Sequence, residues 1–278
     1  MSNESKENNK KTNLKKPSII FIHGLCHGAW CWHKYISFFE SHGYECRAFD
    51  LRGHGRKEPK NKDFRFIKFH CGIRFDEYCM DLDKEINMCN TKPIVIGHSM
   101  GGAVLQKYIE CEENSSKIRA AVLLASIPRV PKGKSEWKYS FKMMRKIMFT
   151  PVSLLALFGI KCKKSLSKSA FFSGAKPQAI PQNEIDEYID KLGREPLYVA
   201  LKLSFLRLVF KIYEGNVPVC VVGSRDDALF AENELHATAE FYGTKAIIFN
   251  DMCHDLMLDP KYKKPAEAIL EFINSRVS

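Results

Sequence analysis

A serine inside a G-x-S-x-G motif is the residue best suited to chemistry in this chain. The motif runs from Gly97 to Gly101 and places Ser99 directly after an apolar run and before an amphipathic stretch. The glycines permit a tight strand-to-helix turn that exposes the serine hydroxyl, and the start of the helix favours negative charge beside it. Ser99 is therefore predicted to be a nucleophile.

A serine hydroxyl needs a base to take its proton and a third group to orient that base. Asp226 follows the apolar run at 217–222, and His254 follows the run at 245–249. The order serine, aspartate, histidine along the chain gives a predicted triad of Ser99, Asp226 and His254. Asp227 is the rival for the acid role, because only one of two adjacent side chains can face His254.

Two backbone N–H groups are expected to stabilise the negative oxygen that forms during attack by the serine. Met100 follows the nucleophile, and Leu25 lies in the loop after the first predicted strand, where Gly24 permits close approach of the backbone. His23 and His27 in this loop are four residues apart, but they lie in a turn with no third ligand near in sequence. We expect no metal and no other cofactor.

Short apolar runs alternate with amphipathic stretches along most of the chain. The runs predict strands at 18–22, 45–49, 93–96, 120–124, 217–222 and 245–249, and the amphipathic stretches predict helices at 32–42, 74–88, 101–112, 232–241 and 264–275. This alternation is typical of an α/β fold with a mostly parallel central sheet and helices on both faces. It breaks at 129–211, where we predict a helical cap inserted between the core segments 17–128 and 212–278.

The net charge of +11 is concentrated in one part of the 278 residues. Residues 129–176 hold twelve Lys and Arg against a single acid, Glu136, which accounts for the whole excess. Basic charge without a recognisable binding module is weak support for nucleic acid, so no nucleic-acid partner is expected. The polar segment 1–16 is predicted to be a disordered basic tail.

The predicted cap contains a basic amphipathic stretch at 137–148. Apolar residues recur in it at spacings of four, three and four, at Trp137, Phe141, Met144 and Met148, and its basic residues are Lys138, Lys142, Arg145 and Lys146. One interpretation is a cap helix with a solvated charged face. The other is peripheral contact with an anionic membrane.

Two further observations concern the compartment of the protein. Residues 1–16 contain no apolar segment of the kind found in secretory signals, and no apolar run is long enough to cross a bilayer. The ten cysteines include no C-x-x-C pair, which favours reduced core thiols. A cytoplasmic chain is expected.

The chain resembles the α/β-hydrolase superfamily from about residue 17 to residue 273. Five motifs in the expected order carry the resemblance: FIHG at 21–24, DLRGHG at 50–55, GHSMGG at 97–102, GSRD at 223–226, and His254. The stretch HGLCHGAWCW at 23–32 is similar to the plant methyl-ester esterase and hydroxynitrile lyase branch. The motifs GHSMGG and DLRGHG recur among lysophospholipase-like and monoacylglycerol-lipase-like members.

This resemblance implies a serine hydrolase, with a small-molecule ester as its partner. The expected reaction is cleavage of a carboxylic ester through an acyl-enzyme, and a lipid-type ester is one candidate substrate. The alternatives are a small-molecule-binding protein of this fold without turnover, a thioesterase and a C–C bond hydrolase, because fold alone does not decide the reaction.

Overall fold

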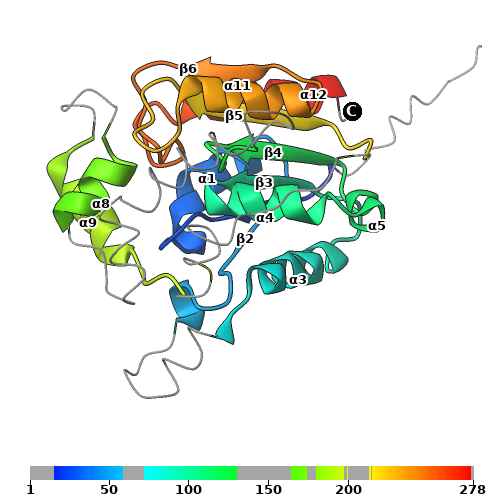
Figure 1. Cartoon of the computed structure of the whole chain (residues 1–278), viewed down its shortest axis with the longest axis horizontal. Helices are drawn as coiled ribbons and strands as arrows, with labels where there is room; N and C mark the ends of the chain where they lie inside the picture. The colour runs from blue at the N-terminus through cyan, green and yellow to red at the C-terminus, as the bar shows by residue number, and fades with distance from the viewer. Residues whose placement is uncertain are drawn as a thin grey trace, which may run out of the picture.

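A single parallel sheet of six strands forms the centre of the protein (Figure 1). The computed structural model describes residues 16–58, 72–129, 164–173, 180–196, 199, 213 and 215–276. The strands are β1 (Ile19–Ile22), β2 (Cys46–Phe49), β3 (Ile94–His98), β4 (Ala120–Leu124), β5 (Val219–Ser224) and β6 (Ala246–Phe249). Their order across the sheet is β2-β1-β3-β4-β5-β6, and each neighbouring pair is parallel.

Helices cover both faces of this sheet. They include α1 (His33–Ser41), α3 (Phe75–Asn87), α4 (Met100–Tyr108), α5 (Glu112–Ser115), α11 (Glu232–Phe241) and α12 (Lys263–Arg276), with short 3-10 turns η1 (Ala29–Trp32) and η2 (Gly55–Lys57). Alternate residues of β1 belong to different apolar cores: Phe21 packs with residues of α1 and α12, whereas Ile20 packs with residues of α3 and α4. Because side chains alternate along a strand, burial on both faces explains why the strands are continuous apolar runs.

The predicted α/β fold with a parallel sheet is confirmed. Each predicted strand and helix of the core is present, with ends that move by one or two residues except for the third helix, which ends at Tyr108 and is followed by the separate short helix α5. Between β4 and β5, the described residues form α8 (Lys164–Phe171) and α9 (Gln182–Lys191), which lie beside the sheet in Figure 1. The exact limits of the predicted cap, 129–211, stay a prediction.

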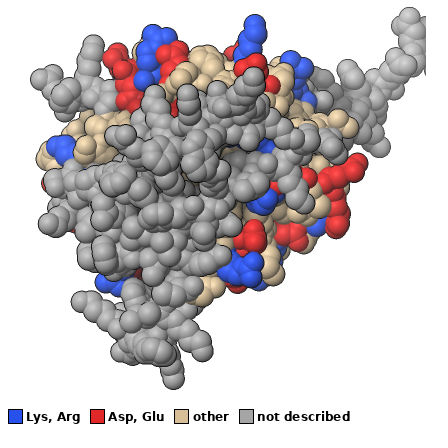
Figure 2. All heavy atoms as spheres, in the orientation of Figure 1, with Lys and Arg blue, Asp and Glu red and all other residues tan. Residues whose placement is uncertain are grey.

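Charged side chains of both signs share the face shown in Figure 2. Among the described residues drawn there, blue and red groups lie next to one another around the edge of the molecule. The basic stretch predicted at 137–148 lies outside the described residues, as does the tail at 1–15. Within the described part of the chain, no helix has the length and apolar character needed to cross a membrane.

Candidate active site

Ser99 occupies a sharp turn between β3 and α4. Its φ angle is +51°, a left-handed conformation that is rare for residues other than glycine. Hydrogen bonds hold both of its backbone groups: the Ser99 N–H donates to the Leu124 carbonyl at 3.1 Å, and the Ser99 carbonyl accepts from the N–H of Ile127 at 3.1 Å. A strained residue kept in place by its surroundings is typical of a functional site, as expected for the predicted nucleophile.

The glycines of the motif are required by close packing around this turn. A Cβ atom on Gly97 would lie 2.5 Å from the Gly101 carbonyl oxygen, and one on Gly101 would lie 2.4 Å from the Ile22 carbonyl oxygen. Both distances are far below van der Waals contact. The G-x-S-x-G pattern is therefore explained by sterics: the start of α4 packs directly against the ends of β1 and β3.

His254 forms a buried hydrogen bond with Asp227, at 2.8 Å from Nδ1 to Oδ2. The other oxygen of Asp227 accepts from the backbone N–H groups of Leu229 and Phe230, which fixes the carboxylate. Because Nδ1 donates to the carboxylate, the lone pair of His254 is at Nε2, and this atom has no hydrogen-bond partner among the described residues. An oriented imidazole with a free Nε2 is what a general base requires.

The expectation that Asp226 pairs with His254 is wrong. Asp226 is exposed, and its Oδ2 accepts from the backbone N–H of Asp251 at 2.7 Å. The reason is the length of β5, which runs through Ser224 rather than ending at Val222. The turn therefore begins two residues later than expected, and Asp227 is the residue whose side chain reaches His254.

The Asp227 carboxylate also controls the basicity of His254. Burial by itself would lower the pKa of His254, but the charge of Asp227 and its hydrogen bond outweigh burial, so that the pKa is raised above its ordinary value. The nearby Asp255 carboxylate acts in the same direction. A base with a raised pKa accepts a proton readily from a serine hydroxyl, and it loses activity when acid protonates it.

A second buried imidazole–carboxylate pair lies one residue beyond His254. His27 Nε2 is 3.0 Å from Asp255 Oδ2, and both side chains are fully buried. His27 donates from Nδ1 to the Leu25 carbonyl at 2.6 Å, so both ring nitrogens are in use. Although burial alone would raise the pKa of Asp255, His27 and His98 lower it, which keeps Asp255 ionised.

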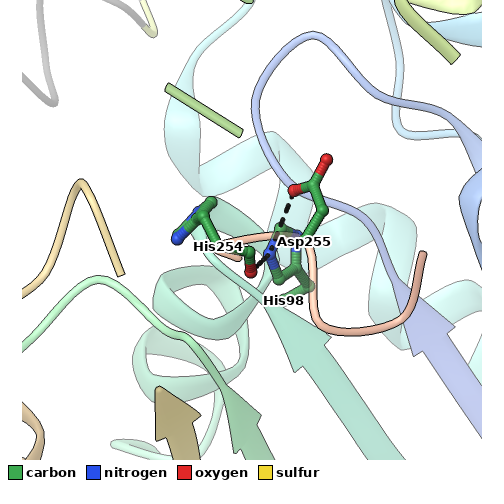
Figure 3. A group of neighbouring side chains, drawn as sticks. All are labelled: His98, His254 and Asp255. Carbon is green, nitrogen blue, oxygen red and sulfur yellow. Dashed lines mark hydrogen bonds and ion pairs between the residues drawn. The ribbon is translucent and has the colours of Figure 1, made fainter. Parts of the chain in front are cut away.

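His98 lies between the Asp255 carboxylate and the backbone carbonyl of His254, as Figure 3 shows. Its Nε2 lies 3.2 Å from the His254 carbonyl oxygen and 3.6 Å from Asp255 Oδ1. Burial lowers the pKa of His98 well below its usual value, so the ring is neutral and donates from Nε2. The three residues offer possible metal-ligand atoms within 4.8 Å of one another. His254 Nδ1, His98 Nε2 and Asp255 Oδ2 are held by Asp227, by the His254 carbonyl and by His27. The other atom of each group, His98 Nδ1, His254 Nε2 and Asp255 Oδ1, has no hydrogen-bond partner among the described residues.

The loop that contains Leu25 lies against the nucleophile. A Cβ atom on Gly24 would lie 3.0 Å from Ser99 Cβ. The Gly24 carbonyl accepts from His23 Nδ1 at 2.9 Å and from the His27 N–H at 3.3 Å. Because a trans peptide is planar, these bonds also fix the N–H of Leu25, which points the opposite way.

The next polar groups of this loop are also held. The Leu25 carbonyl accepts from His27, the Cys26 N–H donates to Glu195 Oε2 at 3.0 Å, and the Cys26 carbonyl accepts from the Gly193 N–H at 2.7 Å. Between the carbonyls of Gly24 and Cys26, only the Leu25 N–H has no protein partner in the described part of the chain. Its position suits the predicted oxyanion donor.

Met100 is the other predicted oxyanion donor. It is the first residue of α4, where an α-helix leaves its N–H groups without intrahelical partners. The site therefore offers a strained serine, an oriented base and two backbone donors, which together are suited to acyl transfer. The oxyanion role of Leu25 and Met100 stays a prediction.

Sequence reasoning ranked one acidic residue of this site too low and missed two others. Asp227 was considered only as the rival of Asp226, and Asp255 was not considered, although it directly follows His254. Glu195 reaches the loop from 169 residues away along the chain. No local sequence pattern predicts a contact between residues so far apart along the chain.

Comparison with known proteins gives one family match that spans most of the chain. The model of the family described as Serine aminopeptidase, S33, matches residues 14–261. Methylesterase 7 of Arabidopsis thaliana is 28% identical over 149 residues, which are 54% of this chain and 53% of that protein. Salicylic acid-binding protein 2 of Nicotiana tabacum is 32% identical over 108 residues, covering 39% and 38%. The chain thus matches about half the length, or less, of these curated relatives.

Solved structures share the fold at low sequence identity. Polyneuridine aldehyde esterase has a TM-score of 0.68 at 20% identity and covers 92% of this chain and 99% of its own. A methylesterase of Arabidopsis has a TM-score of 0.66 at 19% identity, covering 93% and 99%. A non-heme bromoperoxidase of Mycobacterium tuberculosis has a TM-score of 0.67 at 17% identity, covering 95% and 94%. The arrangement of strands and helices described above is therefore the one these proteins have.

Proposed function

Because the chain belongs to the Serine aminopeptidase S33 family within the α/β-hydrolase superfamily, we propose that it is a serine esterase that cleaves the methyl ester of a small carboxylic acid. The observation that carries this proposal is the geometry of His254, with Nδ1 bound to Asp227 and Nε2 without a partner among the described residues. Its ring lies 4.8 Å from the ring of His98, the residue that precedes the strained Ser99. A protein that only binds its ligand does not need this arrangement.

The proposed reaction has two steps. His254 Nε2 takes the proton of the Ser99 hydroxyl as its oxygen attacks the ester carbonyl, and the N–H groups of Leu25 and Met100 bind the negative oxygen. The tetrahedral intermediate collapses, His254 passes the proton to the departing methoxide, and methanol leaves. Water, activated by the same His254, then attacks the acyl-serine and releases the acid. Asp227 stabilises the imidazolium that forms in each step.

The preference for a methyl ester comes from the names of several relatives. Methylesterase 7 of Arabidopsis and Methyl jasmonate esterase 1 of Vitis vinifera are similar to this chain over part of their length. A lipid-type ester, which the basic cap sequence suggested, has no support among the described residues. The substrate class is thus assigned by similarity, whereas the reaction type is assigned by the site.

A panel of substrates tests this proposal. It contains methyl esters of small aromatic and aliphatic acids, a long-chain monoacylglycerol, a thioester and an aminoacyl anilide, each assayed with wild-type protein and with Ser99→Ala. We expect the methyl esters to give the highest kcat/KM and Ser99→Ala to be inactive. Preference for the anilide would indicate a peptidase, and preference for the monoacylglycerol would indicate a lipase. Absence of turnover with every substrate would favour a binding protein without catalysis.

Peripheral contact with an anionic membrane through residues 137–148 is a second, separable proposal. It is supported by the sequence pattern of Trp137, Phe141 and Met144 opposite Lys138 and Lys142. Sedimentation with vesicles of mixed neutral and anionic lipid tests it. We expect replacement of both lysines by glutamine to reduce binding and to leave hydrolysis of short soluble esters unchanged. Equal sedimentation of the two proteins would contradict membrane contact.

A further inference from the structure

Glu195 is a fully buried acid that makes its hydrogen bonds beside the proposed active site. It lies after α9, in a segment whose sequence gives no sign of catalysis. Its Oε2 accepts from the Cys26 N–H at 3.0 Å and from His54 Nε2 at 2.9 Å. Its other oxygen, Oε1, is buried and has no hydrogen-bond partner among the described residues. A buried carboxylate is costly to keep, so its contacts need an explanation.

The segment that carries Glu195 holds the Cys26 residue from both sides. The Gly193 N–H donates to the Cys26 carbonyl at 2.7 Å, while Glu195 accepts from the Cys26 N–H. Cys26 itself has a φ of +61°, which is unfavourable for a residue with a side chain. These two hydrogen bonds therefore maintain a backbone conformation that the loop would not keep alone.

The peptide between Leu25 and Cys26 is thus fixed at both ends. Its carbonyl accepts from His27 Nδ1, and its N–H donates to Glu195. The Leu25 N–H belongs to the preceding peptide, so rotation of the Leu25–Cys26 peptide would change the Leu25 backbone angles and turn that N–H away from Ser99. Small displacements of an oxyanion donor lower the rate because the donor must match the developing charge.

We propose that Glu195 is a positioning residue of the oxyanion hole, which holds the Cys26 peptide so that the Leu25 N–H faces the reacting carbonyl. This inference rests on the proposed esterase function. It makes the segment after α9 part of the catalytic apparatus, although Glu195 does not touch the substrate. The docking of this segment on the loop is then a condition for turnover and not only a means of covering the site.

His54 is the partner that allows an acid to be buried in this position. Its Nδ1 lies 3.3 Å from the Arg52 carbonyl, so it donates there, and its Nε2 faces Glu195. Burial would lower the pKa of His54, but Glu195 outweighs burial and raises it. The DLRGHG motif therefore contributes a residue that supports Glu195, in addition to shaping the fold.

Three variants separate a hydrogen-bonding role from a role of charge or bulk. Glu195→Leu removes the acceptor at similar size. Glu195→Gln removes the charge but can keep an acceptor oxygen at the position of Oε2, where it accepts from the Cys26 N–H and from His54 Nε2. Glu187→Leu, on the exposed surface of α9 where Glu187 pairs with Lys191, is the matched control for loss of an acid in this region.

The first readout is kinetic and uses a small methyl ester that wild-type protein hydrolyses. Glu195→Leu should lower kcat by about 100-fold with little change in KM, because removing an oxyanion donor costs about 10²–10³-fold. Affinity for a trifluoromethyl ketone, which forms an oxyanion on Ser99, should fall in parallel. Glu195→Gln should keep most of the activity, and Glu187→Leu should match wild type. A folded Glu195→Leu with wild-type kcat, or a Glu195→Gln as impaired as Glu195→Leu, would overturn the proposal.

If Glu195→Leu does not fold, Glu195→Asp replaces it, because the shorter side chain keeps the charge but draws the carboxylate away from Cys26. We then expect Glu195→Asp to lose kcat while Glu195→Gln retains it. Wild-type kcat in Glu195→Asp would contradict the inference.

The second readout does not depend on turnover. Hydrogen exchange at the Cys26 amide should be slow in wild-type protein and in Glu195→Gln, and faster by at least about tenfold in the variant that lacks the acceptor, because exchange follows local opening. Equal exchange in all variants would show that Glu195 does not hold the Cys26 peptide. A different outcome separates this proposal from the proposed function. If wild-type protein hydrolyses no ester but its Cys26 amide is protected in a way that depends on Glu195, the proposed function is refuted and the hydrogen bond from Cys26 to Glu195 still holds the loop.

Discussion

Two of the buried imidazole–carboxylate pairs contain neighbouring residues of the chain, His254 and Asp255, and they differ in what the second ring nitrogen of the histidine does. In the pair of His254 and Asp227, the second ring nitrogen of the histidine has no hydrogen-bond partner among the described residues. In the pair of His27 and Asp255, the second nitrogen donates to the Leu25 carbonyl. The first pair can therefore exchange a proton with a substrate, whereas the second pair can only hold its neighbours in place.

This difference teaches that proximity of histidine to an acid does not by itself identify a catalytic residue. A catalytic histidine is identified by a ring nitrogen without a hydrogen-bond partner, together with a nucleophile from which that nitrogen can take a proton. Substitutions in the two pairs should accordingly have opposite profiles. Those in the pair of His254 and Asp227 should affect rate more than stability, and those in the pair of His27 and Asp255 should affect stability more than rate.

The largest effect is expected for the nucleophile that the first pair serves. Ser99→Ala should lower kcat/KM for a small methyl ester by about 10⁴-fold or more, as removal of a triad member does in serine hydrolases. The melting temperature should not fall, because alanine packs in the same turn. The assay is release of acid or methanol over time. Persistent turnover would mean that the pair of His254 and Asp227 serves some other group.

Replacement of the two adjacent aspartates comes next. Asp227→Asn should lower kcat by about 10³–10⁴-fold, because an amide favours the wrong tautomer of His254 and does not stabilise the imidazolium. Asp226→Asn is the matched control and should change kcat by less than about threefold, since surface substitutions have small effects. Initial rates at saturating substrate compare the two. A larger loss of kcat in Asp226→Asn than in Asp227→Asn would show that Asp226 is the acid of the triad.

Substitution in the pair of His27 and Asp255 should mainly lower the free energy of unfolding. Asp255→Leu leaves His27 buried without its acid, and breaking a buried pair in this way costs about 3–5 kcal/mol of the free energy of unfolding. The rate should fall by only about tenfold, because His27 keeps its bond to Leu25. Urea unfolding and steady-state kinetics on one preparation check both numbers. Unchanged stability with a rate as low as that of Asp227→Asn would contradict the division of roles.

The smallest effect is a shift of the pH profile. Since the pKa of His254 is raised, kcat/KM should fall as the pH decreases through a midpoint above 6.5, because protonation removes the lone pair of Nε2. Asp255→Asn removes one of the charges that raise this pKa, so its acid limb should lie at lower pH than that of wild type. The pH dependence of kcat/KM measures both. A limb that moves to higher pH in Asp255→Asn would show that Asp255 does not act on His254.

The fold and the nucleophile could be predicted because their signals are local. Apolar runs identified the strands, and the glycines at 97 and 101 identified the turn, since only glycine fits where a Cβ would lie 2.5 Å or less from a carbonyl oxygen. His254 was found because it follows the last predicted strand. Each of these inferences needs only neighbours in sequence.

The acid and the supporting residues depend on contacts that the sequence does not display. Asp227 differs from Asp226 only by the point at which β5 ends, a boundary that an apolar run cannot define to one residue. The role of Asp255 depends on its contact with His27, more than two hundred residues earlier. The role of Glu195 depends on its contact with Cys26. Three-dimensional proximity, not residue type, assigns these roles.

The central claim, that Ser99 is activated by His254 and Asp227, is tested most directly by covalent labelling. A fluorophosphonate is added to wild-type protein, Asp226→Asn, Asp227→Asn and Ser99→Ala, and intact mass is followed over time. We predict one adduct in wild type and in Asp226→Asn at equal rates, much slower labelling of Asp227→Asn, and none of Ser99→Ala. An adduct on Ser99→Ala, or normal labelling of Asp227→Asn with slow labelling of Asp226→Asn, would contradict the account.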